Sequence, residues 1–374
     1  SYRVWRSDNR GDSWETVSGD LTKGEERIEL PIMGRKQSWD NPWDIYAMSN
    51  YSTITSLAES PVVEGILYAA TDDGIIQVTQ NDGVSWRRID VGSIKGIPAT
   101  AFVNDIRADL FDPYTVYAAL DNHKYGDFNP YIIKSTDAGR SWKVITGGIS
   151  ERTLVWRLVQ DHVRKELLFA ATEFGVWFTI DGGEKWTRMK GGLPTISFRD
   201  ITIQRRESDL VAASFGRGFF ILDDITPLRE LKTEMLEKEA LLFPVMDALL
   251  YQPQRVTVSP GNSEYRAENP SFGALFTYYL KEDMKSLKEL RKKSEKELNE
   301  TESDIPFPGW DALEMELKED DPFLVVTVKD AGGKVVNHVK APAKKGIQRI
   351  SWDLRYASAG GLDPDEGSEE LEVD

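Results

Sequence analysis

Two aspartates, Asp105 and Asp200, are the residues of this chain best placed to do chemistry as a pair. Each stands near the start of a strand that we expect to lie innermost in its sheet, with its side chain toward the axis of a ring of sheets. Glycoside hydrolysis uses two carboxyl groups roughly 5 to 10 Å apart. The alternative is structural, because an aspartate beside Asn104 or Arg199 can be satisfied by backbone N–H groups or by the neighbouring charge.

The same strand starts carry polar, cationic and aromatic side chains suited to binding. Guanidinium groups pair with carboxylates in a bidentate fashion, and a ring of sheets concentrates polar groups at its mouth. We therefore expect this mouth to hold a peptide, a protein or a glycan. The candidate contact residues are Asn104, Asp105, Trp156, Arg157, Arg199 and Asp200.

The sequence predicts neither a metal site nor a cofactor site. It contains no cysteine, and its three histidines stand in separate elements without a second ligand at metal spacing. These histidines are His123, His162 and His338. The glycines at 216 and 218 lack the rest of a phosphate-binding loop and read as a turn between strands.

A fourfold repeat predicts the architecture that positions these residues. The pattern S/T-x-D/N-x-G-x-x-W occupies residues 7–14, 79–86, 135–142 and 179–186. Its third residue can accept hydrogen bonds from its own turn, its Gly permits a positive φ, and its Trp starts the next strand as a buried anchor. This Asp-box pattern is typical of hairpins on the rim of a β-propeller and does no chemistry. The structural Asp-box residues are Asn9, Trp14, Asn81, Trp86, Asp137, Trp142, Asp181 and Trp186.

A second repeat has the spacing of propeller blades. Small-residue strands, each with an Ala-Ala pair, recur in steps of 49, 52 and 42 residues, close to the roughly 40–50 residues of a four-stranded blade. We predict three complete blades, preceded by a hairpin at 1–18 and followed by a blade without a box. Such an arc does not close, so we expect the chain to be part of a longer protein or an arc completed by other subunits. The Ala-Ala strands are 67–71, 116–120, 168–172 and 210–214.

The composition changes after the propeller blades, which we place at 1–231. A linker is expected at 232–242, followed at 243–362 by a β-sandwich of immunoglobulin or fibronectin type. The predicted fold is therefore all-β, a partial β-propeller of about four four-stranded blades joined to a sandwich.

A charged insert interrupts the predicted sandwich at 281–304. Apolar residues at helical spacing predict a helix over 284–298 with its charged face in solvent, and a partner-binding helix is the alternative. The acidic tail at 363–374 lacks aromatic residues and is expected to be disordered or cut short.

Composition and charge exclude two classes of protein. The net charge is -16, so the phosphate backbone of a nucleic acid would be repelled. No apolar run approaches the roughly 18 to 20 residues of a membrane span.

Several segments together carry a family resemblance: 71–74, 117–131, 172–176, 216–224 and 352–356. With the boxes, they resemble bacterial sortilin-like Asp-box (BNR-repeat) β-propeller proteins, which are often labelled glycosyl hydrolases. The resemblance spans residues 1 to about 356, with the long insert as a departure. It implies a larger propeller, an exported protein that is extracellular or periplasmic, and a ligand-binding role rather than a known reaction.

Two functions follow from these patterns. We favour a non-catalytic recognition module that binds peptide, protein or glycan at the axial face of the propeller. The alternative is a glycoside hydrolase of sialidase or xyloglucanase type, whose catalytic carboxylates lie partly outside this chain. The Arg-Ile-Pro signature of Asp-box sialidases does not occur in the sequence.

Overall fold

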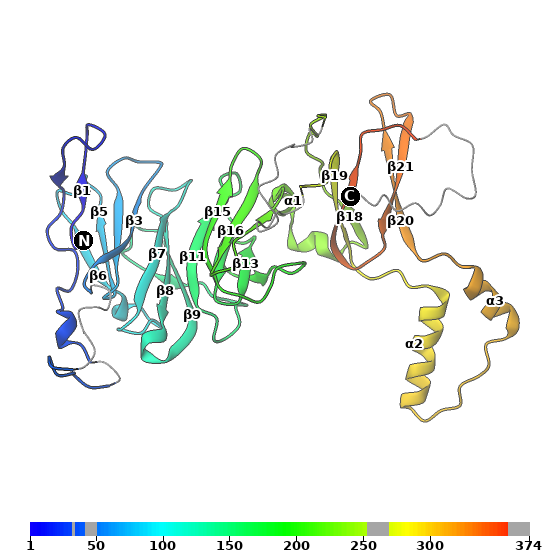
Figure 1. Ribbon diagram of the computed structural model, residues 1–374, viewed down its shortest axis with the longest axis horizontal. Helices are drawn as coiled ribbons and strands as arrows, with labels where there is room; N and C mark the ends of the chain where they lie inside the picture. The colour runs from blue at the N-terminus through cyan, green and yellow to red at the C-terminus, as the bar shows by residue number, and fades with distance from the viewer. Residues whose placement is uncertain (32–33, 42–50, 253–268, 358–374) are drawn as a thin grey trace. The chain divides into compact units, whose positions relative to one another are not determined.

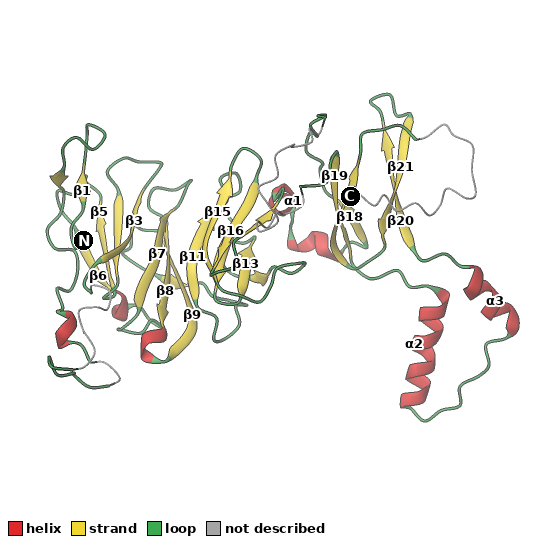
Figure 2. Cartoon of the chain, viewed as in Figure 1, coloured by secondary structure: helices red, strands yellow, loops and turns green. Residues whose placement is uncertain are grey.

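The protein is described by a computed structural model that covers residues 1–31, 34–41, 51–252 and 269–357. The chain divides into two compact units, Ser1–Arg229 and Glu230–Asp374, which are described separately (Figure 1). All described strand pairs are antiparallel, and helices are few (Figure 2). The protein is all-β, with an arc of propeller blades in the first unit and a sandwich in the second.

Three four-stranded sheets follow one another along the first unit (Figure 1). In each sheet the first strand is the inner one, and the inner strands of neighbouring sheets contact one another. The sheets are β3 (Ile54–Glu59), β4 (Leu67–Thr71), β5 (Ile75–Thr79) and β6 (Arg87–Asp90); β7 (Phe102–Ala108), β8 (Val116–Asn122), β9 (Asp127–Ser135) and β10 (Lys143–Val144); and β11 (Val155–Gln160), β12 (Leu168–Thr172), β13 (Gly175–Thr179) and β14 (Thr187–Arg188).

The blades at the two ends of the first unit have fewer strands than the others. A two-stranded hairpin precedes the complete blades, and a three-stranded sheet follows them. Among the described residues the last strand, β17, pairs only with β16, and its Phe219 and Ile221 are 75% and 60% exposed. These strands are β1 (Trp5–Arg6), β2 (Glu15–Thr16), β15 (Phe198–Gln204), β16 (Asp209–Ser214) and β17 (Phe219–Leu222).

The Ala-Ala strands form the cores of the blades. In the three complete blades both alanines of each pair are fully buried. Branched and aromatic side chains from the neighbouring strands pack around them in two large clusters. The buried alanines are Ala69, Ala70, Ala118, Ala119, Ala170 and Ala171.

The acids and amides at the third box position point into their own turns. Asp137 accepts hydrogen bonds from the backbone N–H groups of Arg140 and Ser141 and from the Ser141 hydroxyl, at 2.6 to 2.9 Å. The box glycines have φ between 76° and 102°, in the region that favours glycine. A Cβ on Gly83 would lie 2.4 Å from the carbonyl oxygen of Val17, so this box also needs glycine for its close approach to the preceding strand.

The box tryptophans differ in burial, which corrects the expectation that all four are buried. Trp186 is only 2% exposed, and its indole N–H donates to the carbonyl of Ile145 in the preceding blade, at 2.7 Å. Trp86 is half-buried and donates in the same way to Val17, at 3.0 Å. Two of the four therefore fasten one blade to the next.

The other two tryptophans fold back on their own turns. The indole N–H of Trp142 donates to Gly139 and that of Trp14 donates to Gly11. At the seam before Trp142, Arg87 of the preceding blade already donates to the carbonyl of Gly139. Trp14 is 59% exposed because no described blade precedes its hairpin.

The second unit contains two antiparallel sheets that share an apolar cluster. Tyr278, Leu280 and Ala341 are buried in this cluster, where Leu324 and Ile350 pack against them. The strands are β18 (Ala240–Leu242), β19 (Ala274–Leu280) and β22 (Gly346–Trp352) in one sheet, and β20 (Phe323–Lys329) and β21 (Val335–Pro342) in the other.

The expected linker at 232–242 needs correction, because its last residues form β18. This strand pairs with β19 over Ala240–Leu242 and so belongs to the sandwich. The sequence pattern missed it because a strand of three residues is too short to show alternation.

One helix overlaps the predicted span 284–298, and a second helix lies beyond the insert at 281–304. They are α2 (Leu287–Glu300), which begins with a capping box formed by Ser286 and Glu289, and α3 (Trp310–Lys318). No residue of either helix is buried. The remaining helices of the described residues are short: η1 (Arg27–Glu29), η3 (Val91–Ser93), η4 (His123–Tyr125), α1 (Thr226–Glu230) and η5 (Thr233–Glu237).

Among the described helices, none is both long and apolar enough to cross a membrane. The predicted acidic tail at 363–374 lies outside the described residues.

Replacing Trp186 by Ala should lower the free energy of unfolding by about 3 to 5 kcal/mol, because the change leaves a cavity and an unpaired carbonyl between two blades. Trp14→Ala is the matched control and should cost only about 0.5 kcal/mol, since that ring is largely in solvent. Urea unfolding followed by circular dichroism would measure both. Equal losses for the two variants would contradict the assignment of Trp186 as the blade fastener.

Low pH should reduce the stability that Asp137 gives to the turn of the third box. Hydrogen bonds from the Ser141 hydroxyl and from backbone N–H groups lower the pKa of this carboxyl to about 2. Its stabilising contribution is therefore present above its ordinary pKa and is lost as pH falls toward 2. At this half-buried site, discounted for solvent screening, we expect a contribution of about 1 kcal/mol.

Asp137→Asn is the test variant, because asparagine occupies the same position in two other boxes. The stability difference between wild type and variant should shrink between pH 5 and pH 2, as measured by thermal unfolding. A difference that stays constant over this range would show that the carboxylate charge does not matter.

Candidate functional site

All four inner strands carry a β-bulge at the same place near their start. There the pairing with the second strand of the blade shifts, so that two residues of the inner strand oppose one of its partner. A bulge re-aims the side chain of the extra residue. These extra residues are Thr55, Asn104, Trp156 and Arg199.

The four bulged residues all line one hollow of about 400 Å³, called here the first hollow. It lies where the inner strands begin, at the same end of the blades as the turn η4 that follows β8. Its volume is within the range of small-molecule sites. The complete lining is Thr55, Phe102, Asn104, Asp121, His123, Lys124, Trp156, Arg157 and Arg199.

A second hollow of about 360 Å³ adjoins the first. The two share His123, Trp156 and Arg199, so these side chains form a common wall. The other lining residues of the second hollow are Phe128, Arg152, Leu154, Glu173 and Phe174.

The common wall is a stack of aromatic and cationic side chains. The guanidinium carbon of Arg199 lies 3.8 Å from the ring centroid of Trp156, and His123 meets the same ring edge-on at 5.9 Å. The Trp156 indole N–H donates to Glu173 Oε2 at 3.0 Å, and the Ser197 hydroxyl donates to the same oxygen at 2.9 Å. These contacts join residues of three blades in one network.

Two further cations lie over aromatic rings beside the hollows. Lys124 lies over Phe102 at 4.8 Å in the first hollow, and Arg152 lies over Phe128 at 5.4 Å in the second. Neither cation forms an ion pair with a carboxylate of the described residues. Their N–H donors therefore remain available to a ligand.

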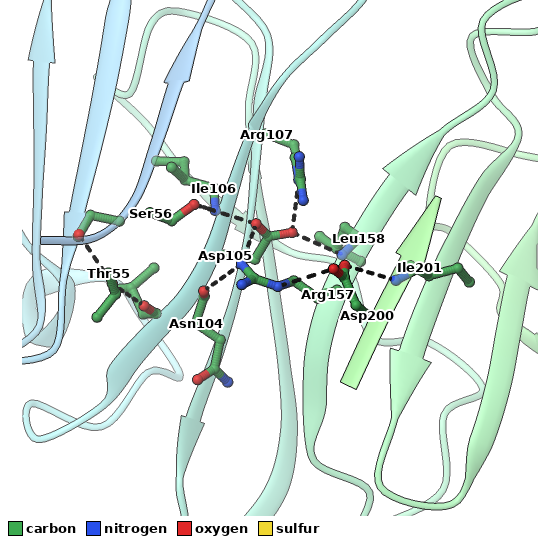
Figure 3. Close-up of polar contacts among 12 residues, drawn as sticks. Thr55, Ser56, Asn104, Asp105, Ile106, Arg107, Arg157, Leu158, Asp200 and Ile201 are labelled. Carbon is green, nitrogen blue, oxygen red and sulfur yellow. Dashed lines mark hydrogen bonds and ion pairs between the residues drawn. The ribbon is translucent and has the colours of Figure 1, made fainter. Parts of the chain in front are cut away.

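Asp105 does not line the first hollow, and several donors surround its carboxylate (Figure 3). It is 1% exposed and accepts from Arg107 Nε at 2.9 Å and from Arg157 Nη1 at 3.1 Å. The backbone N–H of Leu158 and the hydroxyl of Ser56 also donate to it, at 3.0 and 3.3 Å. A carboxylate with four donors and no contact with solvent serves to join strands rather than to exchange protons.

Asp200, by contrast, is open to solvent, and its side chain is 65% exposed. It accepts from the backbone N–H of Ile201 at 2.9 Å and lies 3.9 Å from Arg157 Nε. Arg157 thus stands between Asp200 and Asp105, as Figure 3 shows. The two aspartates share one guanidinium group instead of facing each other across an open space.

Two carboxyl groups near the hollows have shifted pKa values. Burial raises the pKa of Asp72 in the turn after β4, although hydrogen bonds from Thr53 oppose the shift. Burial also acts on Asp127 at the start of β9, but there the hydroxyl of Tyr131 and other donors outweigh it and lower the pKa. In the part of the chain that the structure describes, no group of three metal-ligating side chains could hold a metal ion.

The structure brings four of the six sequence-predicted contact residues into the first hollow. Asn104, Trp156, Arg157 and Arg199 line it, whereas neither Asp105 nor Asp200 does. Sequence reasoning missed residues that follow the second strand of a blade. In each blade the turn after the second strand lies at the same end as the start of the inner strand. Applying this rule to the sequence would have found the missed residues. The missed residues include His123, Lys124, Glu173 and Phe174.

Comparisons with known proteins find no matching family model and no matching curated protein. Among solved structures, the GH74 xyloglucanase from Xanthomonas campestris matches at 13% identity over 46% of this chain and 29% of that chain, with a TM-score of 0.38. An ancestral GH74 enzyme matches at 16% identity over 75% of this chain and 34% of that one, with a TM-score of 0.42. YCF48 bound to D1 peptide matches at 14% identity over 46% and 52%, with a TM-score of 0.36. The chain spans 29 to 52% of the length of these three structures.

Asp105→Asn should destabilise the protein by about 1 to 3 kcal/mol, because an amide places a donor group at a site that is 1% exposed and already surrounded by four donors. Asp200→Asn, at an exposed ion pair, should change stability by less than about 1 kcal/mol. Urea unfolding of the two variants measures the contrast. A fully stable Asp105→Asn variant would contradict the structural role of this carboxylate.

Proposed function

We propose that this chain is a non-catalytic recognition module that binds the anionic group of a peptide, protein or glycan ligand in the first hollow. The observation that carries the proposal is the convergence of four equivalent β-bulges on one hollow. Bulges disturb strand pairing and occur frequently beside functional sites, where they redirect side chains. Four of them at one place, in four successive blades, provide a shaped and polar lining.

Charge supports an anionic ligand group. The protein has a net charge of -16, yet Lys124, Arg157 and Arg199 line this hollow. The lining carboxylate, Asp121, is 2% exposed and in contact with His123. Lys124 lies over Phe102 and has no ion pair among the described residues. Arg199 lies over Trp156 and also stands 3.7 Å from Glu173 Oε2, so its charge is partly balanced.

The geometry around Arg157 favours binding over glycoside hydrolysis. A hydrolase needs one carboxyl group that holds a proton near neutral pH and a second one across an open groove. Here Asp105 is held by four donors and Asp200 lies beside the same guanidinium. We further propose that the protein is exported, extracellular or periplasmic, on the strength of its sequence resemblance.

The binding proposal is tested by calorimetric titration of the full chain with galacturonate, N-acetylneuraminate, succinate and short peptides that have a free carboxyl terminus. At least one of these probes should bind. Arg199→Gln and Lys124→Gln should each weaken that binding by about 10- to 100-fold, the effect of losing one charge-assisted hydrogen bond of about 1.5 to 3 kcal/mol.

Arg206→Gln is the matched control, because Arg206 is exposed and lies in the turn between β15 and β16, at the far end of the strand that carries Arg199. It should leave binding unchanged. The same preparations are assayed with aryl-glycosides. Turnover that disappears in a folded Asp200→Asn variant would establish the hydrolase alternative, and failure of every probe to bind would overturn the proposed site.

A further inference from the structure

We propose that the ligand is an acidic oligosaccharide, with successive uronate residues in the first and second hollows on either side of the Trp156–Arg199 wall. This inference rests on the proposed function and adds the chemical class and minimum length of the ligand. It starts from the observation that two hollows of about 400 and 360 Å³ adjoin and share three lining residues. A ligand that fills only one of them leaves half of the available surface unused.

Each hollow has its own unpaired cation over an aromatic ring. Lys124 over Phe102 serves the first hollow, and Arg152 over Phe128 serves the second. Arg199 in the common wall borders both. This repetition of one feature on both sides of the wall matches a ligand that repeats a negative charge along its length.

The backbone at Arg152 allows its side chain to be removed in a clean test. Its φ is 59°, in the left-handed region that favours glycine. An arginine at such a position costs conformational free energy relative to glycine. Because glycine suits this backbone better, the variant Arg152→Gly removes the cation without threatening the fold.

Hydrogen-bond acceptors in the hollows favour a sugar over an acidic peptide side chain. Glu173 Oε2 accepts hydrogen bonds from the Trp156 indole and the Ser197 hydroxyl. Glu173 Oε1 has no partner among the described residues. Asn104 donates through Nδ2 to Val155, so its Oδ1 is likewise without a described donor. A uronate sugar brings hydroxyl donors as well as a carboxylate, whereas an aspartate or glutamate side chain brings acceptors only.

The second hollow also offers an apolar surface. Phe174 and Phe128 line it and are 45% and 40% exposed. An aromatic ring open to solvent suits the C–H face of a sugar ring, while the neighbouring cation takes the carboxylate. Extended peptides usually bind along the edge of a strand. These hollows lie at the ends of the strands, so no edge of a described strand lies along them.

The test compares the affinity of the full chain for galacturonate, digalacturonate and trigalacturonate by calorimetry. The longer ligands should bind about tenfold tighter or more, because the second contact is intramolecular once the first has formed. In Arg152→Gly this gain should disappear while the affinity for galacturonate stays unchanged. In Lys124→Gln both the single sugar and the longer ligands should bind more weakly.

Two matched probes complete the design. Methyl-esterified trigalacturonate keeps the length but loses the charges, and triglutamate keeps the charges but lacks sugar hydroxyls; neither should show the gain. If galacturonate binds and trigalacturonate binds no tighter, this inference fails while the proposed function stands. A gain with triglutamate equal to that with trigalacturonate would overturn the assignment to an oligosaccharide.

Discussion

The buried carboxylate of Asp105 is the interaction on which the geometry of the propeller mouth depends. It lies in β7 and joins Ser56 of the preceding inner strand to Arg157 and Leu158 of the following one. Ser56 makes an equivalent link one blade earlier, where its hydroxyl accepts from the backbone N–H of Ile106. The inner strands β3 and β7 are thus each set against the next inner strand by the residue that follows the bulge.

This linkage explains how the layer of bulged residues is supported by the layer of residues that follows it. Residues after the bulges are tied to the neighbouring blade, so the bulged residues are positioned by a rigid base. The side chains of Thr55 and Asn104 each donate to a backbone carbonyl of the next inner strand, at 2.6 and 2.9 Å. Trp156 and Arg199 instead stack on each other. A preorganised site of this kind loses little conformational entropy on binding.

Features that depend on neighbouring residues could be predicted from the sequence, whereas features that depend on contacts between distant segments could not. The turn bonds of Asp137 follow from box spacing, because donor and acceptor lie within four residues. Trp186 and Trp14 occupy the same position of the same motif, yet Trp186 is buried and Trp14 is exposed. The difference lies in what precedes each hairpin. The bulge at Trp156 depends on its pairing partner, so no spacing in β11 alone predicts it.

The three-stranded last blade has a consequence for the behaviour of the protein in solution. Strand β17 presents an open edge beside the exposed side chains of Phe219 and Ile221, which is a template for pairing with another chain. The net charge of -16 keeps such edges apart by mutual repulsion between molecules. Salt shortens the range of that repulsion to about 8 Å at physiological ionic strength. Colloidal stability of this chain is therefore electrostatic, and it falls as salt rises or as pH approaches the isoelectric point near 4.9.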